Sequence, residues 1–193
     1  MTASSAAAAD SGSMDEAALV RRAQMGDRAA FGAIVRAHQA GALRLATVIC
    51  GDSTEAYDIV QDSFVKAFHA LPRVRSTESL RPWLMRIIAN EAKNSRRSRA
   101  RREARIEREI RFRVDDAPPT DDIALTSVAA EHLTAAIVRL SDADRHVIAC
   151  RYFAELSEAE TASALGVAKG TVKSRTARAL VRLRADLGDE VNP

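Results

Sequence analysis

The chain is poor in the residues that build strands and loop-rich scaffolds. Aromatic residues make up only 4% of its 193 residues, and it has eight glycines and five prolines. No window alternates apolar and polar residues as a half-buried strand does, while alanine is plentiful, so we expect an all-α fold. A chain of this length forms one or two small domains, each able to bury a core.

Cysteine is also scarce. Cys50 and Cys150 lie in apolar surroundings, one in each half, and no second cysteine or histidine stands at ligand spacing. We therefore expect no metal site and no cofactor. Two buried thiols in a reducing cytoplasm are the preferred interpretation, and a redox switch is the alternative.

Membrane and catalytic signals are missing as well. No apolar run approaches the roughly 20 residues of a membrane span, and residues 1–14 lack the layout of a signal peptide. We expect a cytoplasmic chain without membrane insertion, beginning with a disordered tail over 1–14. Four scattered histidines, no glycine-rich phosphate loop and no distinct carboxylate pair predict that the chain is not an enzyme.

The charge is clustered, although the formal net charge is only +3. Half of residues 96–113 are arginine, which favours contact with nucleic acid phosphates; a solvated helix surface is the alternative. Residues 115–122 contain four acids and two prolines and predict a linker. This polyanion could imitate nucleic acid or serve as a simple tether.

Residues 156–184 have the pattern of two short helices with a tight turn. Ser157 can cap the first helix, Glu160 completes a capping box, and Gly166 ends it. The second helix starts near Lys169, with an apolar stripe on one side. A DNA-binding helix-turn-helix needs such a helix with a basic outer face, because it enters the major groove. A hairpin in an ordinary bundle is the alternative. The outer face carries Lys169, Thr171, Lys173, Ser174, Arg175, Arg178 and Arg182.

Upstream, the apolar spacing predicts several further helices. A stripe over 15–38 is interrupted at Gly26-Asp27, a second helix covers 42–49, and a third covers 55–71 with Ser53 or Thr54 as its cap. We expect a loop over 73–80 and then a helix that starts near Pro82 and enters the arginine-rich run. The predicted organisation is two small helical domains joined by a flexible linker: a tail over 1–14, a domain over 15–98, a basic then acidic linker over 99–126, and a helix-turn-helix domain over 127–193.

Two blocks of this sequence resemble one known family. Residues 19–45, 57–71 and 81–97 resemble the first conserved domain of bacterial RNA polymerase sigma factors of the extracytoplasmic-function (ECF) class, and residues 140–184, with GTVKSR at 170–175, resemble the second. The resemblance covers about 150 residues in the right order, with a linker between the blocks. Ala168 stands where the family usually has serine or proline. A helix-turn-helix alone is shared by many regulators, whereas the pair of blocks is specific.

This resemblance implies a subunit that binds core RNA polymerase, recognises promoter DNA and assists its melting. It implies that the second domain reads the −35 element through the seven outward residues of the recognition helix. The remaining implied site residues are Arg73, Arg75, Ser76, Thr77, Glu78, Arg81, Arg86, Asn90 and Asn94 for the −10 element, and Asp58, Gln61, Asp62 and Lys66 for core polymerase.

Spacing alone leaves several alternatives open. From spacing, a solvated surface is preferred for the third helix, and only the resemblance reverses this. Trp83 sits at core spacing, so burial is preferred over base stacking. A two-domain helix-turn-helix regulator acting without polymerase is the rival function. Family members are commonly inhibited by an anti-sigma factor, and the sequence does not say whether this chain has one.

Overall fold

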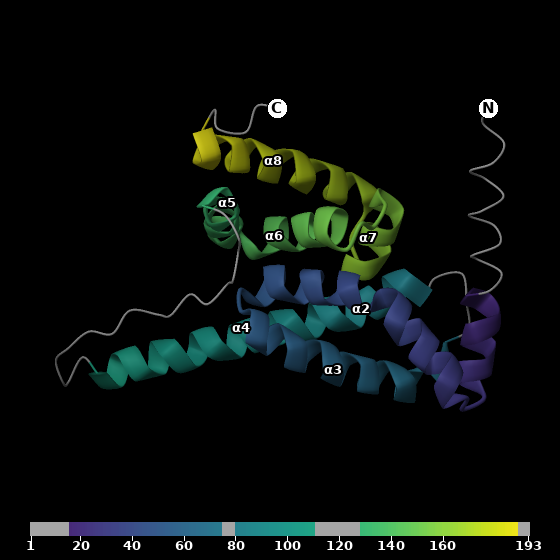
Figure 1. The fold of residues 1–193 in the computed structure, drawn as a ribbon. Coiled ribbons are helices and arrows are strands. Elements are labelled where there is room, and N and C mark those ends of the chain that lie inside the picture. The colour runs from purple at the N-terminus through teal and green to yellow at the C-terminus, as the bar shows by residue number, and fades with distance from the viewer. Residues whose placement is uncertain (1–15, 75–79, 111–127, 189–193) are drawn as a thin grey trace, which may run out of the picture.

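The computed structural model describes residues 16–74, 80–110 and 128–188, which form helices joined by short connections (Figure 1). These three ranges contain no strand, and the predicted all-α fold is confirmed. The expected tail over 1–14 and the acidic segment over 115–122 lie outside the described residues. In chain order the elements are a helix over 16–24, α2 (Arg28–Cys50), α3 (Ser53–Ala70), the 3-10 turn η1 (Leu71–Arg73), α4 (Leu80–Ile110), α5 (Val128–Arg139), α6 (Asp142–Ile148), the π-helical turn η3 (Ala149–Phe153), α7 (Glu158–Leu165) and α8 (Lys169–Leu187).

The first helix and α2 are separated by a turn at Gly26-Asp27. Gly26 has φ of +91°, and the Asp27 carboxylate accepts hydrogen bonds from the backbone N–H groups of Ala29 and Ala30 at 2.9 and 3.0 Å. The helix expected separately over 42–49 is wrong as a separate element, because α2 runs unbroken through Gly41. Packing of this long helix against α3 and α4 outweighs the cost of a mid-helix glycine, about 1 kcal/mol.

The turn between α2 and α3 is capped from both sides. Gly51, at φ +79°, ends α2 and donates its N–H to the Thr47 carbonyl at 2.8 Å. The Asp52 carboxylate accepts from the Glu55 N–H at 2.9 Å and so caps α3. The expectation that Ser53 or Thr54 is the cap is wrong, because the helix starts at Ser53, two residues before the expected start at residue 55.

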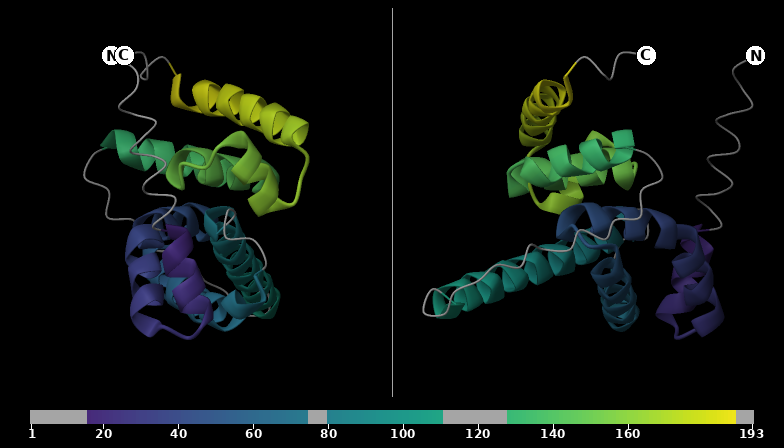
Figure 2. Two further views of the ribbon diagram at one scale, coloured as in Figure 1. Left: turned by 90° about the vertical axis from the view of Figure 1, so that its right-hand side faces the viewer. Right: turned by 60° about the vertical axis from the view of Figure 1, so that its left-hand side comes forward.

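The helices form two layers, with α2, α3 and α4 below and α5 to α8 above (Figure 1), and Figure 2 shows the same separation from two other directions. The layers share an apolar core in which Leu45 and Ile88 of the first half pack with Cys150, Leu156 and Ala164 of the second. The sequence predicts two domains joined by a flexible linker and gives no indication that they pack against each other. This contact is therefore known from the structure alone.

Candidate nucleic-acid and polymerase interfaces

The helix-turn-helix has the predicted local geometry. Ser157 Oγ accepts from the Glu160 N–H at 3.2 Å, and the Glu160 carboxylate accepts from the Ser157 N–H at 2.8 Å, which is the expected capping box. Gly166 ends α7 at φ +65°, where glycine has little strain, and donates to the Ala162 carbonyl. Ala168 is the N-cap of α8 and its side chain makes no capping hydrogen bond.

One face of α8 is buried and the opposite face is open. Val172, Ala179 and Leu183 are buried against the rest of the second half. The Ser174 hydroxyl donates to the Thr171 carbonyl at 3.1 Å, so in this state it is turned toward its own helix. None of the predicted −35 residues is buried. Lys169, Lys173, Ser174, Arg178 and Arg182 are exposed, and Thr171 and Arg175 are partly exposed.

Two arginines of this open face share a carboxylate that the sequence did not reveal. Asp144 on α6 has a side chain that is only 1% exposed. It accepts from Arg178 Nη2 at 3.0 Å and from Arg182 Nη1 at 3.2 Å. Burial alone would raise the pKa of Asp144, but hydrogen bonds from Arg178 and Ser141 and the two guanidinium charges hold this pKa below its ordinary value.

A second buried charge supports the same unit. Arg145, 1% exposed, donates from Nε to the Ile137 carbonyl and from Nη2 to the Val138 and Leu140 carbonyls. These carbonyls lie in the last turn of α5 and just beyond it, so the guanidinium adds hydrogen bonds where the regular helical pattern stops. Burial lowers the pKa of Arg145 to about 10, and the residue is charged at neutral pH.

The predicted −10 residues are only partly described. Arg73, Asn90 and Asn94 are exposed, whereas Arg75, Ser76, Thr77 and Glu78 lie outside the described residues. Trp83 is half-buried and packs against two apolar clusters, which confirms the preference for burial.

Arg81 and Arg86, also predicted to meet DNA, contact the second half of the chain. Arg81 Nη2 donates to the Ala154 carbonyl at 2.6 Å. Arg86 donates to the carbonyls of Ser163 and Ala164 on α7. Both arginines therefore have protein partners in this arrangement of the two halves, which the sequence did not predict.

The predicted polymerase-binding residues form one exposed stripe on α3. Gln61 and Asp62 follow Asp58 by three and four positions, and all three are exposed. Lys66, one turn further on, pairs with Glu91 of α4 at 2.6 Å. Ile59, Val60 and Phe64, on the opposite side, are buried in the core. The core contacts of α3 are therefore made by this other face and not by the stripe.

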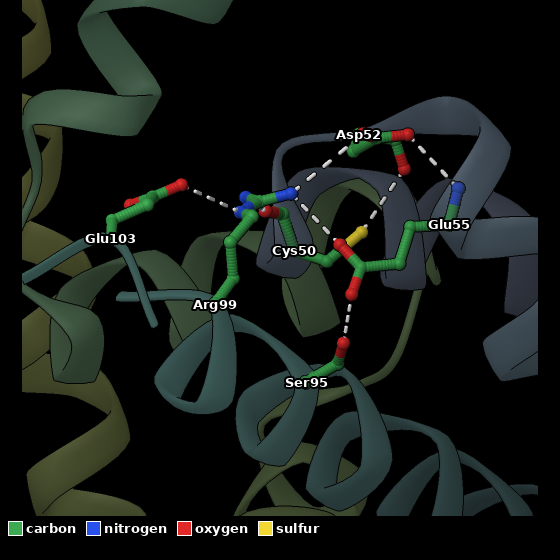
Figure 3. Close-up of polar contacts among 6 residues, drawn as sticks. All are labelled: Cys50, Asp52, Glu55, Ser95, Arg99 and Glu103. Carbon is green, nitrogen blue, oxygen red and sulfur yellow. Dashed lines mark hydrogen bonds and ion pairs between the residues drawn. The ribbon is translucent and has the colours of Figure 1, made fainter. Parts of the chain in front are cut away.

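The arginine-rich run continues α4 to Ile110 as a helix, and its last turns project beyond the rest of the molecule (Figure 2). The first residues of this run are held against the rest of the molecule by ion pairs and hydrogen bonds of their arginine side chains. Arg99 bonds the Glu55 carboxylate at 2.8 Å and also the Cys50 carbonyl, where α2 ends and α3 begins (Figure 3). Arg96 pairs with Asp142 of α6. These two arginines are therefore partly neutralised, unlike the exposed Arg101 and Arg102.

Chemistry beyond binding has little support among the described residues. Cys50 and Cys150 are buried free thiols, as expected. Within the described ranges, no three His, Cys, Asp or Glu residues are grouped so that they could hold a metal ion. No helix in the described part of the chain is long and apolar enough to cross a membrane.

The described residues thus form a two-part helical protein with a basic helix-turn-helix face on α8 and a separate polar stripe on α3. Comparison with known proteins gives the family. Residues 34–102 match Sigma-70 region 2 and residues 136–185 match Sigma-70 region 4. The chain belongs to the ECF sigma factors of the sigma-70 family, a family of transcription initiation factors.

Individual relatives cover nearly the whole chain. It is 37% identical over 185 residues to the RNA polymerase sigma factor NccH of Alcaligenes xylosoxydans xylosoxydans, a match that covers 90% of this chain and 94% of the relative. It is 34% identical to the ECF RNA polymerase sigma factor SigM of Mycobacterium tuberculosis, covering 84% of this chain and 80% of SigM. Among solved structures, CnrH in complex with the cytosolic domain of CnrY matches with a TM-score of 0.66 and 29% identity, over 89% of this chain and 96% of that one.

Proposed function

We propose that this chain is the promoter-selecting subunit of a bacterial RNA polymerase: it binds the core enzyme, recognises −35 and −10 elements, assists promoter melting and directs initiation. One observation carries the proposal. α3, which carries the polar stripe, and α8, which carries the open basic face, lie in different layers of the molecule (Figure 1). One chain can therefore dock on a protein through α3 while α8 occupies a DNA groove.

At the −35 element, α8 supplies both general and specific contacts. Lys169 and Lys173 are exposed cations near its start and suit phosphate oxygens, which give affinity without sequence information. Thr171, Ser174 and Arg175 follow at positions that can reach base edges, and an arginine can bond O6 and N7 of guanine together.

At the −10 element, strand opening requires bases to leave the stack, at a cost of a few kcal/mol. Basic residues can hold the separated strand while polar groups read base edges. Arg73, Asn90 and Asn94 are exposed for this role. Arg81 and Arg86 become available only if the second half moves away from α4, so we propose that the two halves separate on the polymerase.

Docking through α3 suits a partner that later dissociates. A polar, partly acidic stripe forms a separable interface with a basic surface better than an apolar one does. The chain acts in the cytoplasm and has no catalytic step of its own, since it supplies binding and the polymerase supplies the chemistry. The solved complex of CnrH with the cytosolic domain of CnrY supports a further protein partner for this chain, and we propose that this partner is an anti-sigma factor.

Retention on purified core RNA polymerase tests the docking. The immobilised wild-type chain is expected to retain the core enzyme, and Asp62→Arg is expected to weaken retention at least tenfold while preserving the helical circular-dichroism spectrum. Asp186→Arg is the matched control, because it changes an exposed acid by the same charge at the far end of α8. Failure of the wild type to retain core polymerase would overturn the proposed function, and equal retention by Asp62→Arg would overturn the docking face.

A further inference from the structure

Asp144 is an acid in an unusual place: it lies buried directly behind α8, the helix with the basic open face. Arg178 and Arg182 are one helical turn apart on α8, so their guanidinium groups reach the same carboxylate. Each of these side chains remains 53% exposed. The carboxylate therefore holds one edge of each guanidinium while the remainder faces solvent.

Stability alone is a weak reason for this arrangement. Removing a carboxylate from water costs several kcal/mol, and well-packed apolar residues at such a site are often as stable or more stable. A carboxylate can, however, do something that an apolar residue cannot: it can fix the direction in which the two guanidinium groups point. A guanidinium fixed at one edge loses rotational freedom, so its outward N–H groups keep one direction.

The three charges also change how the helix attracts DNA. Two guanidinium groups and one carboxylate leave one net positive charge on this part of α8. Phosphate attraction grows with the number of cations that neutralise phosphates, and it is independent of sequence. A buried acid therefore reduces binding to any duplex while leaving oriented donors for the correct one.

We propose that Asp144 is a specificity-determining positioning residue for −35 recognition, acting by orienting Arg178 and Arg182 and by limiting their attraction to phosphates. The inference rests on the proposed function, because it takes the open face of α8 as the −35 reader. Arg178 lies about 13 Å along the helix axis from Lys169, still within reach of a groove that α8 enters by its N-terminal end. Arg182 lies one turn further and serves mainly as the second cation that compensates the buried charge.

The test uses the complete chain with core polymerase, on a promoter with an intact −35 element and on the same DNA with that element scrambled. Asp144→Asn is expected to reduce discrimination between the two DNAs at least threefold. For the free chain on scrambled duplex, it is expected to steepen the dependence of log affinity on log salt by about one. Asp186→Asn removes the same charge from the same half without touching Arg178 or Arg182, and it is expected to change neither quantity.

A mutant cycle that combines Asp144→Asn with the two arginine substitutions separates a positioning role of Asp144 from a general loss of stability. In the Arg178→Ala, Arg182→Ala background, Asp144→Asn is expected to leave the salt slope unchanged, since no guanidinium remains to be released. Asp144→Glu keeps the charge and is expected to retain the wild-type slope. A slope in Asp144→Asn equal to that of Asp186→Asn, with unchanged discrimination, would overturn the proposal.

A second test leaves Asp144 unchanged and compares the salt dependence of two variants of α8. Arg182→Ala is expected to lower the salt slope less than Lys173→Ala, because Asp144 already neutralises part of the Arg182 charge and Lys173 is an exposed cation on the same helix. Equal losses in the two variants would contradict the role of Asp144. Absence of any −35 dependence in wild-type holoenzyme would instead contradict the proposed function.

Discussion

Ala168 begins the recognition helix without a side chain that can accept a hydrogen bond. The first N–H groups of α8 are therefore left without a cap, and serine at such a position typically adds about 1 kcal/mol of stability. We expect Ala168→Ser to raise the melting temperature and to keep or improve promoter binding. Thermal melts and titration with a −35 duplex measure the two effects.

The corresponding aspartate separates stability from DNA binding. Ala168→Asp is also expected to raise the melting temperature, since a carboxylate is an equally good cap. It is expected to bind DNA less tightly than Ala168→Ser, most clearly at low salt, because its charge lies close to phosphates. If neither variant melts higher than the parent, the missing cap does not limit the stability of α8.

The two buried thiols predict an alkaline loss of stability. Burial raises the pKa of Cys50 to about 11 and that of Cys150 to about 12, from an ordinary value of 9.0. Above pH 9 the unfolded chain loses these protons and the folded chain keeps them, so the free energy of unfolding falls as pH rises. At pH 10 each thiol accounts for roughly 1 kcal/mol. In denaturant titrations from pH 8 to 10.5, the free energy of unfolding is expected to fall less steeply with pH for Cys150→Ala than for wild type. Equal slopes for the two proteins would contradict this.

Helix caps could be predicted from neighbouring residues in the sequence, whereas ion pairs between different helices could not. The Ser157–Glu160 capping box and the uncapped Ala168 follow from neighbours in sequence. The ion pairs of Asp144 with Arg178 and Arg182 join residues 34 and 38 positions apart. They depend on how α6 packs on α8, which no local spacing encodes.

Among the elements, the part of α4 after Ala92 shows how a helical stretch with few apolar residues is held in place. Arg99 bonds two acids and a carbonyl at the α2–α3 turn and is one-third exposed (Figure 3). We expect Arg99→Gln to lower the free energy of unfolding by roughly 1 kcal/mol, since several charge-assisted bonds are lost at a partly buried site. Arg102→Gln, at an exposed position of the same helix, is the control and is expected to stay within about 0.5 kcal/mol of wild type. Urea unfolding measures both, and equal values would contradict this account of α4.

Helix existence was easier to predict than helix ends. The apolar stripes correctly placed the buried sides of α3 and α8. The break expected near Gly41 did not occur, because tertiary packing overrides the weak local preference of one glycine. Continuation of α4 to Ile110 depends partly on pairs such as Arg99–Glu55, whose partners lie on another helix.

For the whole molecule, the contact between the halves has a charged rim around its apolar centre. Arg44 donates to the Phe153 carbonyl at 2.8 Å and pairs with Glu155, while Arg96 pairs with Asp142. We expect the double variant Arg44→Ala, Arg96→Ala to increase the radius of gyration in small-angle X-ray scattering while keeping its helix content. The control, Arg36→Ala with Arg97→Ala, alters two exposed arginines and is expected to match wild type. An unchanged radius in the first variant would contradict a role for this rim.

The sequence could not predict this closed arrangement. Residues such as Ala154 and Ala164 look like ordinary core positions of their own half, yet both contribute to the shared core with α2 and α4. Small side chains permit close helix packing but do not specify which helix approaches. The residues predicted for the two interfaces do lie at the surface of α3 and α8, because an outward position follows from helical period alone. Their roles remain predictions.

The most direct test of the central claim is run-off transcription by core polymerase with and without this chain, on a promoter and on its separate −35 and −10 mutants. The proposed function predicts initiation at one site only when the chain is present. It also predicts that Arg175→Ala loses roughly 1–3 kcal/mol of preference at the −35 element alone, and that Asn90→Ala shifts preference at the −10 element alone. No chain-dependent initiation, together with tight duplex binding in the absence of polymerase, would contradict it.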